Sequence, residues 1–488
     1  AAPELAKDLE RRRGVIYTIA PSPKDGNLIW AGTDDGLIHV TKDGGRTWAD
    51  VTPKTLGSWS KVSLIEASPF DAATAYAAIN AIRLDDMRPH VLVTHDFGKT
   101  WTEIIKGLPD APVNAVREDP VRRGLLYAGT ERGVAVSLDG GASWQPLLLN
   151  LPPTSVRDLV VHGDDLVVGT HGRSFWILDD LTPLRQLAPE AASADAFLFA
   201  PQVAYRIRRS KATDTPLPPE EPMGENPPDG AIVDYVLKAA PISPVTLEVL
   251  DAKGALVRRF ASDEKPGPDD ANEIPVPAYW RRPQRVLPAT PGMHRFVWDL
   301  HLPAPDALER QYPISAVPHD TPKEPLGPAV LPGTYTLRLT VDGKMLTRPL
   351  TVKIDPRVKA SAPALEKRFA VATRIADALH RDAEALKRVK TFRKDLAARR
   401  SQAQGGKLSE ALEAADAEAA ALGGGEGRRR RAARDGERDL ATLNADLTTL
   451  YAIVEGADDA PTTQVEASAI ATESALASTL ARAERVGK

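Results

Sequence analysis

The chain has 488 residues, which predicts about three domains on the usual size of a folding unit. Its 62 Lys and Arg residues against 66 Asp and Glu residues leave a net charge of −4, so the charge balance gives no reason to expect nucleic acid or an anionic membrane as a partner. The absence of cysteine excludes disulfides, thiolate nucleophiles and Cys-ligated zinc, and no apolar run approaches the ~18 residues that a membrane span requires.

One nine-residue pattern occurs three times in the first third of the chain, at 40–48, 93–101 and 136–144. All three copies contain [ST]-x-D-x-G-x-[ST]-W. The Asp can accept hydrogen bonds in a tight turn, the Gly supplies a positive φ, and the Trp opens the next strand and buries its ring. We therefore predict structural roles for the Asp and Trp of each copy, namely Asp43, Trp48, Asp96, Trp101, Asp139 and Trp144.

Residues 12–188 read as four repeats of short strands, which is typical of β-propeller blades. The interval between the first two patterns is lengthened by an insert at 81–88, and the fourth repeat ends without the pattern. Four blades form an arc that exposes the apolar faces of its first and last sheets. We expect the remaining blades of a larger propeller, or a partner chain, to cover this open edge.

Four segments resemble bacterial BNR-repeat (Asp-box) proteins that are related to the sortilin propeller: 32–38, 83–86, 116–120 and 173–180. The resemblance extends over roughly residues 10 to 355. It implies a large, exported, multi-bladed propeller followed by a β-sandwich, in a group whose members are often labelled glycosyl hydrolase or sialidase-like. We expect the chain to be a C-terminal portion of such a protein, located outside the cell or in the periplasm, with its export signal absent from this chain.

Residues 189–230 are rich in Ala and Pro and are expected to form a linker. Residues 231–355 contain six or seven short alternating strands with Pro-rich connections, which favour an immunoglobulin-like β-sandwich. Asp342-Gly343 is expected to form the turn of its last hairpin.

Residues 356–488 change to a helical period, and the predicted fold class is therefore mainly β with an α-helical C-terminal region. Leu440, Leu443, Leu447, Leu450 and Val454 step by three and four residues, which indicates the core of a bundle or, alternatively, an oligomer interface. The basic run at 428–431 is interpreted as a solvated loop and not as a nucleic-acid site.

Charged residues gather in the segments between the second and third strands of the four repeats. In a propeller these segments share one face, opposite the repeated pattern. The set comprises Asp34, Asp35, Arg83, Asp85, Asp86, Arg88, Glu131, Arg132, His171 and Arg173. This set allows two interpretations: a binding face for a glycan or an extended peptide, or solvated ion pairs between neighbouring residues.

Glycoside hydrolysis needs two carboxylates about 5–10 Å apart with opposed pKa values. Asp34, Asp35, Asp85 and Asp86 are the weak candidates. A sialidase-like site would need a Tyr nucleophile, a Glu partner and three Arg residues. Tyr17, Glu66, Arg117 and Arg157 lie on first strands, but they do not complete an Arg triad.

The function that we expect is binding of an extracellular glycan, protein or peptide at the charged face. The alternatives are a glycoside hydrolase at that face, and an assembly protein acting through its helices. We expect no metal and no cofactor, because the nine His residues show no metal-ligand spacing.

Overall fold

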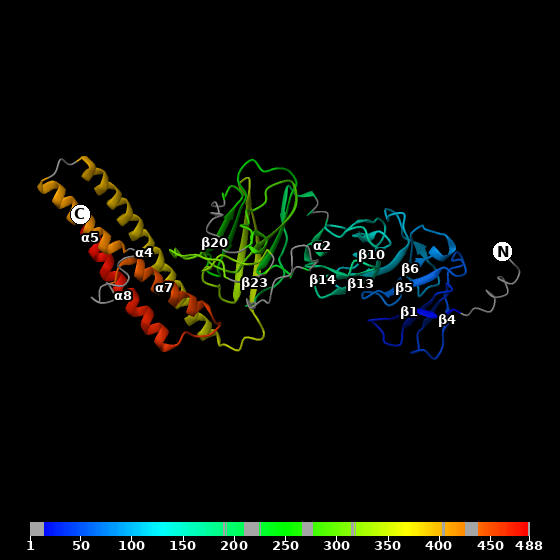
Figure 1. Ribbon diagram of the computed structural model, residues 1–488. Coiled ribbons are helices and arrows are strands. Elements are labelled where there is room, and N and C mark those ends of the chain that lie inside the picture. The colour runs from blue at the N-terminus through cyan, green and yellow to red at the C-terminus, as the bar shows by residue number, and fades with distance from the viewer. Residues whose placement is uncertain are drawn as a thin grey trace. The chain divides into compact units, whose positions relative to one another are not determined.

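The computed structural model describes residues 14–188, 191, 193–208, 224, 226–265, 277–313, 317, 319–402, 406–424 and 438–486 (Figure 1). The chain divides into two compact units, Ala1–Ser193 and Ala194–Lys488. The prediction of a mainly β chain with several four-stranded sheets and a helical C-terminal region is confirmed. The basic run at 428–431 lies outside the described residues.

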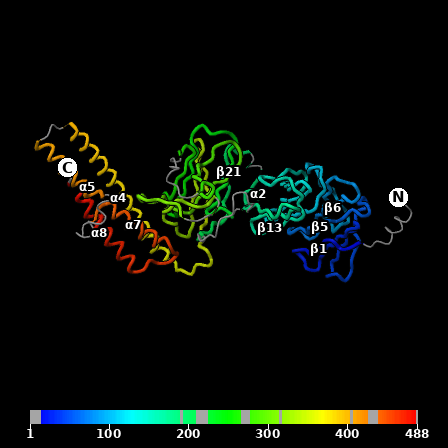
Figure 2. The backbone as a smooth tube through the Cα atoms, in the orientation of Figure 1, coloured from blue at the N-terminus to red at the C-terminus, as the bar shows by residue number. Residues whose placement is uncertain are grey.

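The first unit is a succession of antiparallel sheets in which each strand pairs with the next along the chain. The backbone of this unit is the blue to blue-green part of the tube in Figure 2. The first sheet contains β1 (Ile16–Pro21), β2 (Ile29–Thr33), β3 (Ile38–Thr41) and β4 (Ala49–Asp50). The second contains β5 (Lys61–Ala67), β6 (Ala75–Asn80), β7 (His90–Thr94) and β8 (Thr102–Glu103), with the 3-10 helix η1 (Ile82–Leu84) between β6 and β7. The third contains β9 (Val113–Glu118), β10 (Leu126–Thr130), β11 (Gly133–Ser137) and β12 (Gln145–Pro146).

The fourth sheet has three strands, β13 (Val156–His162), β14 (Asp165–Thr170) and β15 (Phe175–Leu178). The short helix α2 (Thr182–Gln186) follows it, and Leu181 and Leu184 join the core that the third and fourth sheets share. The repeat that lacks the Asp-Gly-Trp pattern is thus the one that lacks a fourth strand.

Consecutive sheets pack against one another through their first two strands, because β5 lies against β1, β9 against β5 and β13 against β9. Glycine allows the close approach: a Cβ on Gly32 would lie 2.5 Å from Val62 Cγ1, and one on Gly129 would lie 2.8 Å from Val156 Cγ1. This succession of packed four-stranded sheets is the one expected for propeller blades.

In the second unit, two sheets enclose one core. The three-stranded sheet has the order β16 (Ala196–Leu198), β18 (Ala231–Leu237), β21 (Gly292–Trp298). The five-stranded sheet has the order β17 (Ala204–Arg206), β23 (Lys344–Ile354), β22 (Gly333–Val341), β19 (Thr246–Leu250), β20 (Leu256–Ala261). A second 3-10 helix, η2 (Ala278–Trp280), lies in the connection before β21.

Two of these strands, β16 and β17, fall within the 189–230 segment that was predicted to be a linker. β16 pairs with β18, and β17 pairs in parallel with β23, about 150 residues along the chain. Their composition resembles a linker because each strand has only three residues, too few to show an alternating pattern. The predicted Asp342-Gly343 turn is confirmed, since Val341 pairs with Lys344.

The described residues after β23 contain α4 (Ala362–Gln402), α5 (Lys407–Gly423), α7 (Leu440–Glu455) and α8 (Thr463–Val486). Asp439 caps α7 by accepting a 2.7 Å hydrogen bond from the Thr442 N–H. The predicted seam residues of α7 pack inside the bundle core, mainly against α4. The seam is therefore core, as the first of the two interpretations held.

Two buried arginines connect the helices with one another and with the sheet part of the same unit. Arg368 of α4 lies 2.7 Å from Glu455 and donates a 3.0 Å bond to the Ala329 carbonyl. Arg206 of β17 lies 2.7 Å from Asp458 and donates to the Val330 carbonyl. Buried guanidinium groups with such partners fix how the two parts of this unit meet.

Candidate ligand-binding site

The three Asp-Gly-Trp corners have the same hydrogen bonds in the first three sheets. In the first corner, Asp43 accepts from the Thr47 N–H at 2.9 Å and from the Thr47 hydroxyl at 2.6 Å, and Thr41 Oγ1 accepts from Gly45 N–H at 2.9 Å. The second and third corners repeat these three distances. The carboxylates are thus occupied in closing their own turns.

These bonds lower the pKa of the corner carboxyls. The Thr47 hydroxyl and N–H hold the pKa of Asp43 at about 2, and Thr100 does the same for Asp96. For Asp139, burial opposes the shift, but the hydroxyl and N–H of Ser143 still lower the pKa. All three acids are therefore ionised acceptors at neutral pH.

The charged residues predicted as a binding set lie at the opposite end of the sheets. We call this end the loop face and define it by the connections between second and third strands: residues 34–37, 81–89, 131–132 and 171–174. In three sheets the first residue of this connection donates to the residue before the first strand: Asp34 N–H to Val15 O, Glu131 N–H to Pro112 O and His171 N–H to Ser155 O.

Asp34 and Asp35 of the first sheet are largely engaged. Asp34 accepts a 2.8 Å bond from the Val15 N–H, and Arg83 of the second sheet lies 3.7 Å away. Asp35 accepts from the Thr33 hydroxyl. The first two connections of the loop face are therefore brought together by the Asp34–Arg83 pair.

Asp86 of the second sheet is held by the side chains of Arg88 and His90. Arg88 donates two bonds to it at 2.9 and 2.7 Å, and His90 lies 3.1 Å away while its other ring nitrogen faces Glu103 at 2.9 Å. The Arg88 bonds, followed by His90, lower the pKa of Asp86 far below its usual range. Asp85 is exposed, with a left-handed backbone at φ 60°.

Glu131 belongs to a set of contacts that joins three sheets at the loop face, and two of its members, Asn114 and Asn80, were not singled out from the sequence. Its Oε1 accepts from Asn114 at 3.0 Å and lies 3.1 Å from Arg157. Buried Asn114 in turn accepts from Asn80 at 2.7 Å. Burial alone would raise the pKa of Glu131, but the hydrogen bonds from Asn114 and Ser155, with Arg157 and His171 nearby, lower it.

Arg132, His171 and Arg173 are exposed, and no ion pair between described residues engages Arg132 or Arg173. Of the predicted set, the structure thus joins Asp34 with Arg83, and Asp86 with Arg88. The Arg132 and Arg173 guanidinium groups and the Asp85 carboxylate face solvent, where a ligand could reach them.

The insert of the second sheet adds apolar side chains that composition did not reveal. Ile82, Leu84 and Met87 are 41%, 46% and 53% exposed, on the same connection as Arg83 and Asp85. A short segment with three exposed apolar side chains between charged ones is unusual for a purely solvated turn. The insert at 81–88 was the feature of the sequence that could have pointed to these exposed apolar residues.

A second charged group lies on the first strands. Arg117 of β9 lies 2.8 Å from Glu66 of β5 and 3.1 Å from Asp158 of β13, and it donates to the Leu159 carbonyl at 2.7 Å. Burial raises the pKa of Glu66, although Arg117 opposes this shift. Tyr17, the other residue considered for sialidase-like chemistry, lies under the Lys61 ammonium, which is 4.5 Å from its ring centroid.

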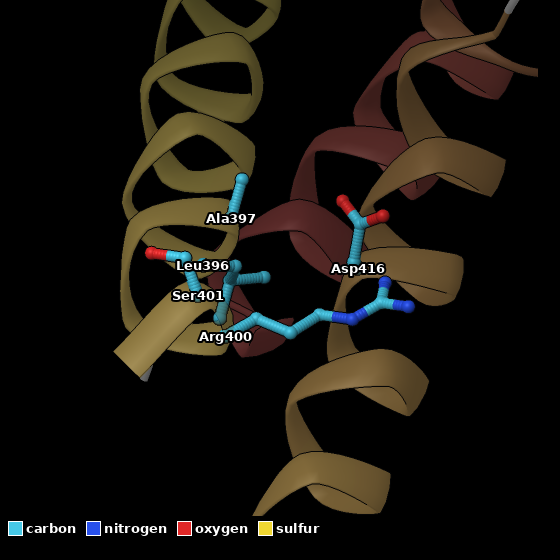
Figure 3. Close-up of a pocket in the computed structure, with 5 residues that line it drawn as sticks. All are labelled: Leu396, Ala397, Arg400, Ser401 and Asp416. Carbon is cyan, nitrogen blue, oxygen red and sulfur yellow. The ribbon is translucent and has the colours of Figure 1, made fainter. Parts of the chain in front are cut away.

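Within the described residues, no group of three or more His, Cys, Asp or Glu side chains is placed to hold a metal ion. None of the helices described has the length and apolar composition to span a bilayer. A hollow of about 400 Å³ lies between α4 and α5, lined by Leu396, Ala397, Arg400, Ser401 and Asp416 (Figure 3). Asp416 is engaged by Arg393 at 2.8 Å, and the remaining lining offers no constellation for catalysis.

No family model and no curated protein matches the chain. Solved structures that share part of its arrangement include the GH74 enzyme of Niastella koreensis (15% identity, 32% of this chain and 26% of that chain, TM-score 0.28). They also include YCF48 from Cyanidioschyzon merolae (20% identity, 34% of this chain and 54% of that one, TM-score 0.26). A third is the GH74 xyloglucanase of Xanthomonas campestris (15% identity, 45% and 35%, TM-score 0.28). The chain thus spans about half or less of the length of each of these neighbours.

Proposed function

We propose that this chain is part of an exported β-propeller protein that binds a protein or peptide segment at the loop face. The observation that carries the proposal is the group of exposed apolar side chains Ile82, Leu84 and Met87 on the second-sheet insert. Protein-binding surfaces combine apolar anchors with a charged rim, and Arg83, Asp85 and Arg132 supply such a rim. Export and the relation to BNR-repeat and sortilin-type propellers belong to this proposal and rest on the resemblance in sequence.

A peptide ligand agrees better with the loop face than hydrolysis of a glycan does. A glycosidase needs a carboxylic acid whose pKa is raised so that it can donate a proton. The two loop-face carboxyls with shifted pKa values, Asp86 and Glu131, are both shifted downward. The hydrolase alternative stays a prediction, supported by neither group.

An immunoglobulin-like arrangement of the two sheets in the second unit stays a prediction, as does an assembly function for the helices. The α7 seam that suggested the assembly function packs within its own bundle, which lends the assembly function no support.

The test is selection of peptides from a random display library against the full chain, with a glycan array as a second arm. We expect selected peptides to bind the natural chain and to lose at least about tenfold in affinity, or ~1.4 kcal/mol, when Ile82, Leu84 and Met87 are all changed to Ser. The control changes to Ser two other exposed apolar residues, Phe175 and Ile177 of β15, which are more exposed than the three residues of the insert.

Equal binding by the triple variant and the natural chain would contradict the proposal. If the chain binds glycans and no peptide is selected, the ligand is a glycan and not a peptide. Release of sugar from a bound glycan would favour the hydrolase alternative.

A further inference from the structure

The Trp of the second corner and the Trp of the third corner each bond to the sheet before their own. The Trp101 Nε1–H donates to the Val51 carbonyl at 2.8 Å, and the Trp144 Nε1–H donates to the Ile104 carbonyl at 2.8 Å. Val51 is the third residue after Trp48, and Ile104 is the third residue after Trp101. One rule therefore describes both junctions: each corner Trp donates to the third residue after the preceding corner Trp.

A corner glycine completes each junction. A Cβ on Gly98 would lie 2.7 Å from Val51 Cβ, and one on Gly141 would lie 2.4 Å from Ile104 Cδ1. The equivalent Gly45 of the first sheet has no neighbour nearer than the Trp48 ring, at 4.0 Å. The first corner thus has the Gly and the Trp that form such a junction. No described residue of another sheet occupies the place that Val51 and Ile104 take in the two observed junctions.

Trp48 shows the consequence. Its side chain is 44% exposed, whereas Trp144 is 5% exposed, and no acceptor for its Nε1–H lies among the described residues. Ile16 and Ile19 of β1 are exposed as well. Large apolar side chains in this number on a sheet face indicate a surface that another element covers.

We propose that the outer face of the first sheet docks a further four-stranded sheet with its own Asp-Gly-Trp corner. In the docked state, the Trp48 Nε1–H donates to the main-chain carbonyl of the third residue after that corner's Trp. The docked sheet needs a fourth strand, because the acceptor residue directly follows the fourth strand in both observed junctions.

The fourth sheet of a second copy of this chain does not meet this requirement. Its described strands are β13, β14 and β15, and α2 stands where a fourth strand would follow. A second copy could therefore cover apolar surface but would leave the Trp48 Nε1–H without its acceptor.

The way the chain enters β1 indicates where the docked sheet comes from. Val15 accepts from Asp34 N–H at 3.1 Å, just as Pro112 accepts from Glu131 N–H at 3.0 Å and Ser155 from His171 N–H at 2.8 Å. Pro112 and Ser155 each end a connection from a preceding sheet. We therefore assign the docked sheet to a segment ahead of β1 in a longer form of the same polypeptide.

The experiment places a copy of residues 61–112 directly before Ile16, in place of residues 1–15, so that the added Ile104 carbonyl can accept from Trp48. Acrylamide quenching of Trp48 fluorescence is obtained as the difference between each protein and its Trp48→Phe variant. We expect the quenching of Trp48 in the extended chain to fall to the level of Trp144, which is measured in the same way with a Trp144→Phe variant. We also expect the first unit of the extended chain to unfold at a higher urea concentration. In the chain without the extension, Trp48 remains open to the quencher.

Three outcomes would overturn the proposal. Trp48 could stay as accessible as before although circular dichroism shows the added strands folded. The chain without the extension could bury Trp48 by self-association in sedimentation, which would make a second copy the occupant. The added sheet could fail to fold both as 61–112 and as the alternative copy 113–155, which would mean that this face does not accept the repeat.

Discussion

At the scale of single residues, Trp48, Trp101 and Trp144 occupy one position in three copies of one pattern but have different surroundings. The local bonds of the corner are the same in all three copies. What differs is the preceding sheet: one covers Trp144, whereas no described sheet precedes the sheet of Trp48, which is exposed. The contribution of each corner Trp to the free energy of unfolding therefore depends on the sheet that packs against it and not on the corner alone.

Changing Trp144 to Ala should lower the free energy of unfolding of the first unit by about 3–5 kcal/mol, because it removes a buried ring and leaves a cavity. Trp48→Ala should cost below about 1 kcal/mol, as exposed positions do. Urea denaturation of the full chain measures both values. Equal losses for the two variants would show that the ring stabilises only its own turn.

Asp382 of α4 is the residue in the second unit that should make stability depend on pH. It is buried, and although Asn444 donates a 2.9 Å bond to it, desolvation raises its pKa to about 7. This pKa lies above the pKa of Asp382 in the unfolded chain. The contribution of protonated Asp382 to the stability of the fold is therefore complete below about pH 4 and is lost as the pH rises to about 7.

Asp382→Asn should remove this loss, so the variant should be more stable than the natural chain at pH 8 and show a smaller change between pH 5 and 8. The slope removed is at most ~1.4 kcal/mol per pH unit. Thermal unfolding of the second unit at several pH values is the measurement. Parallel curves for the two proteins would mean that Asp382 is already ionised in the fold.

At the scale of elements, Arg368 of α4 joins this helix to the end of α7 through Glu455 and to the segment before β22 through the Ala329 carbonyl. Arg368→Met should cost about 3–5 kcal/mol, because it leaves Glu455 charged and without its partner. The double variant Arg368→Met with Glu455→Gln should recover part of this loss. Urea denaturation gives both values, and a single variant as stable as the natural chain would remove the fixing role.

Local pattern predicted the elements well where chemistry and spacing are local. The corner bonds join residues two to four positions apart, and the α7 seam repeats within one helix, so both could be predicted from the sequence. Asn114 bonds to Asn80 and Glu131, 34 and 17 residues away, and such neighbours depend on how the sheets stack. β17 was missed for the same reason, since its partner β23 lies far along the chain.

At the scale of the whole molecule, the first unit has two ends with different roles in this account. The corner end holds ionised carboxylates that are fully used in closing turns. The loop face holds exposed apolar and charged side chains from several sheets, which we propose as the binding surface. Charge changes at the two ends should therefore have unequal effects on a ligand.

The most direct measurement is a binding titration of a library-selected peptide with two matched double variants. Arg83→Glu with Arg132→Glu alters the loop face, and Arg46→Glu with Lys99→Glu alters exposed positions at the corner end by the same charge. We predict a change of at least about tenfold in Kd for the first variant and a much smaller one for the second. Equal changes for both variants, or a larger change for the corner-end variant, would contradict the account.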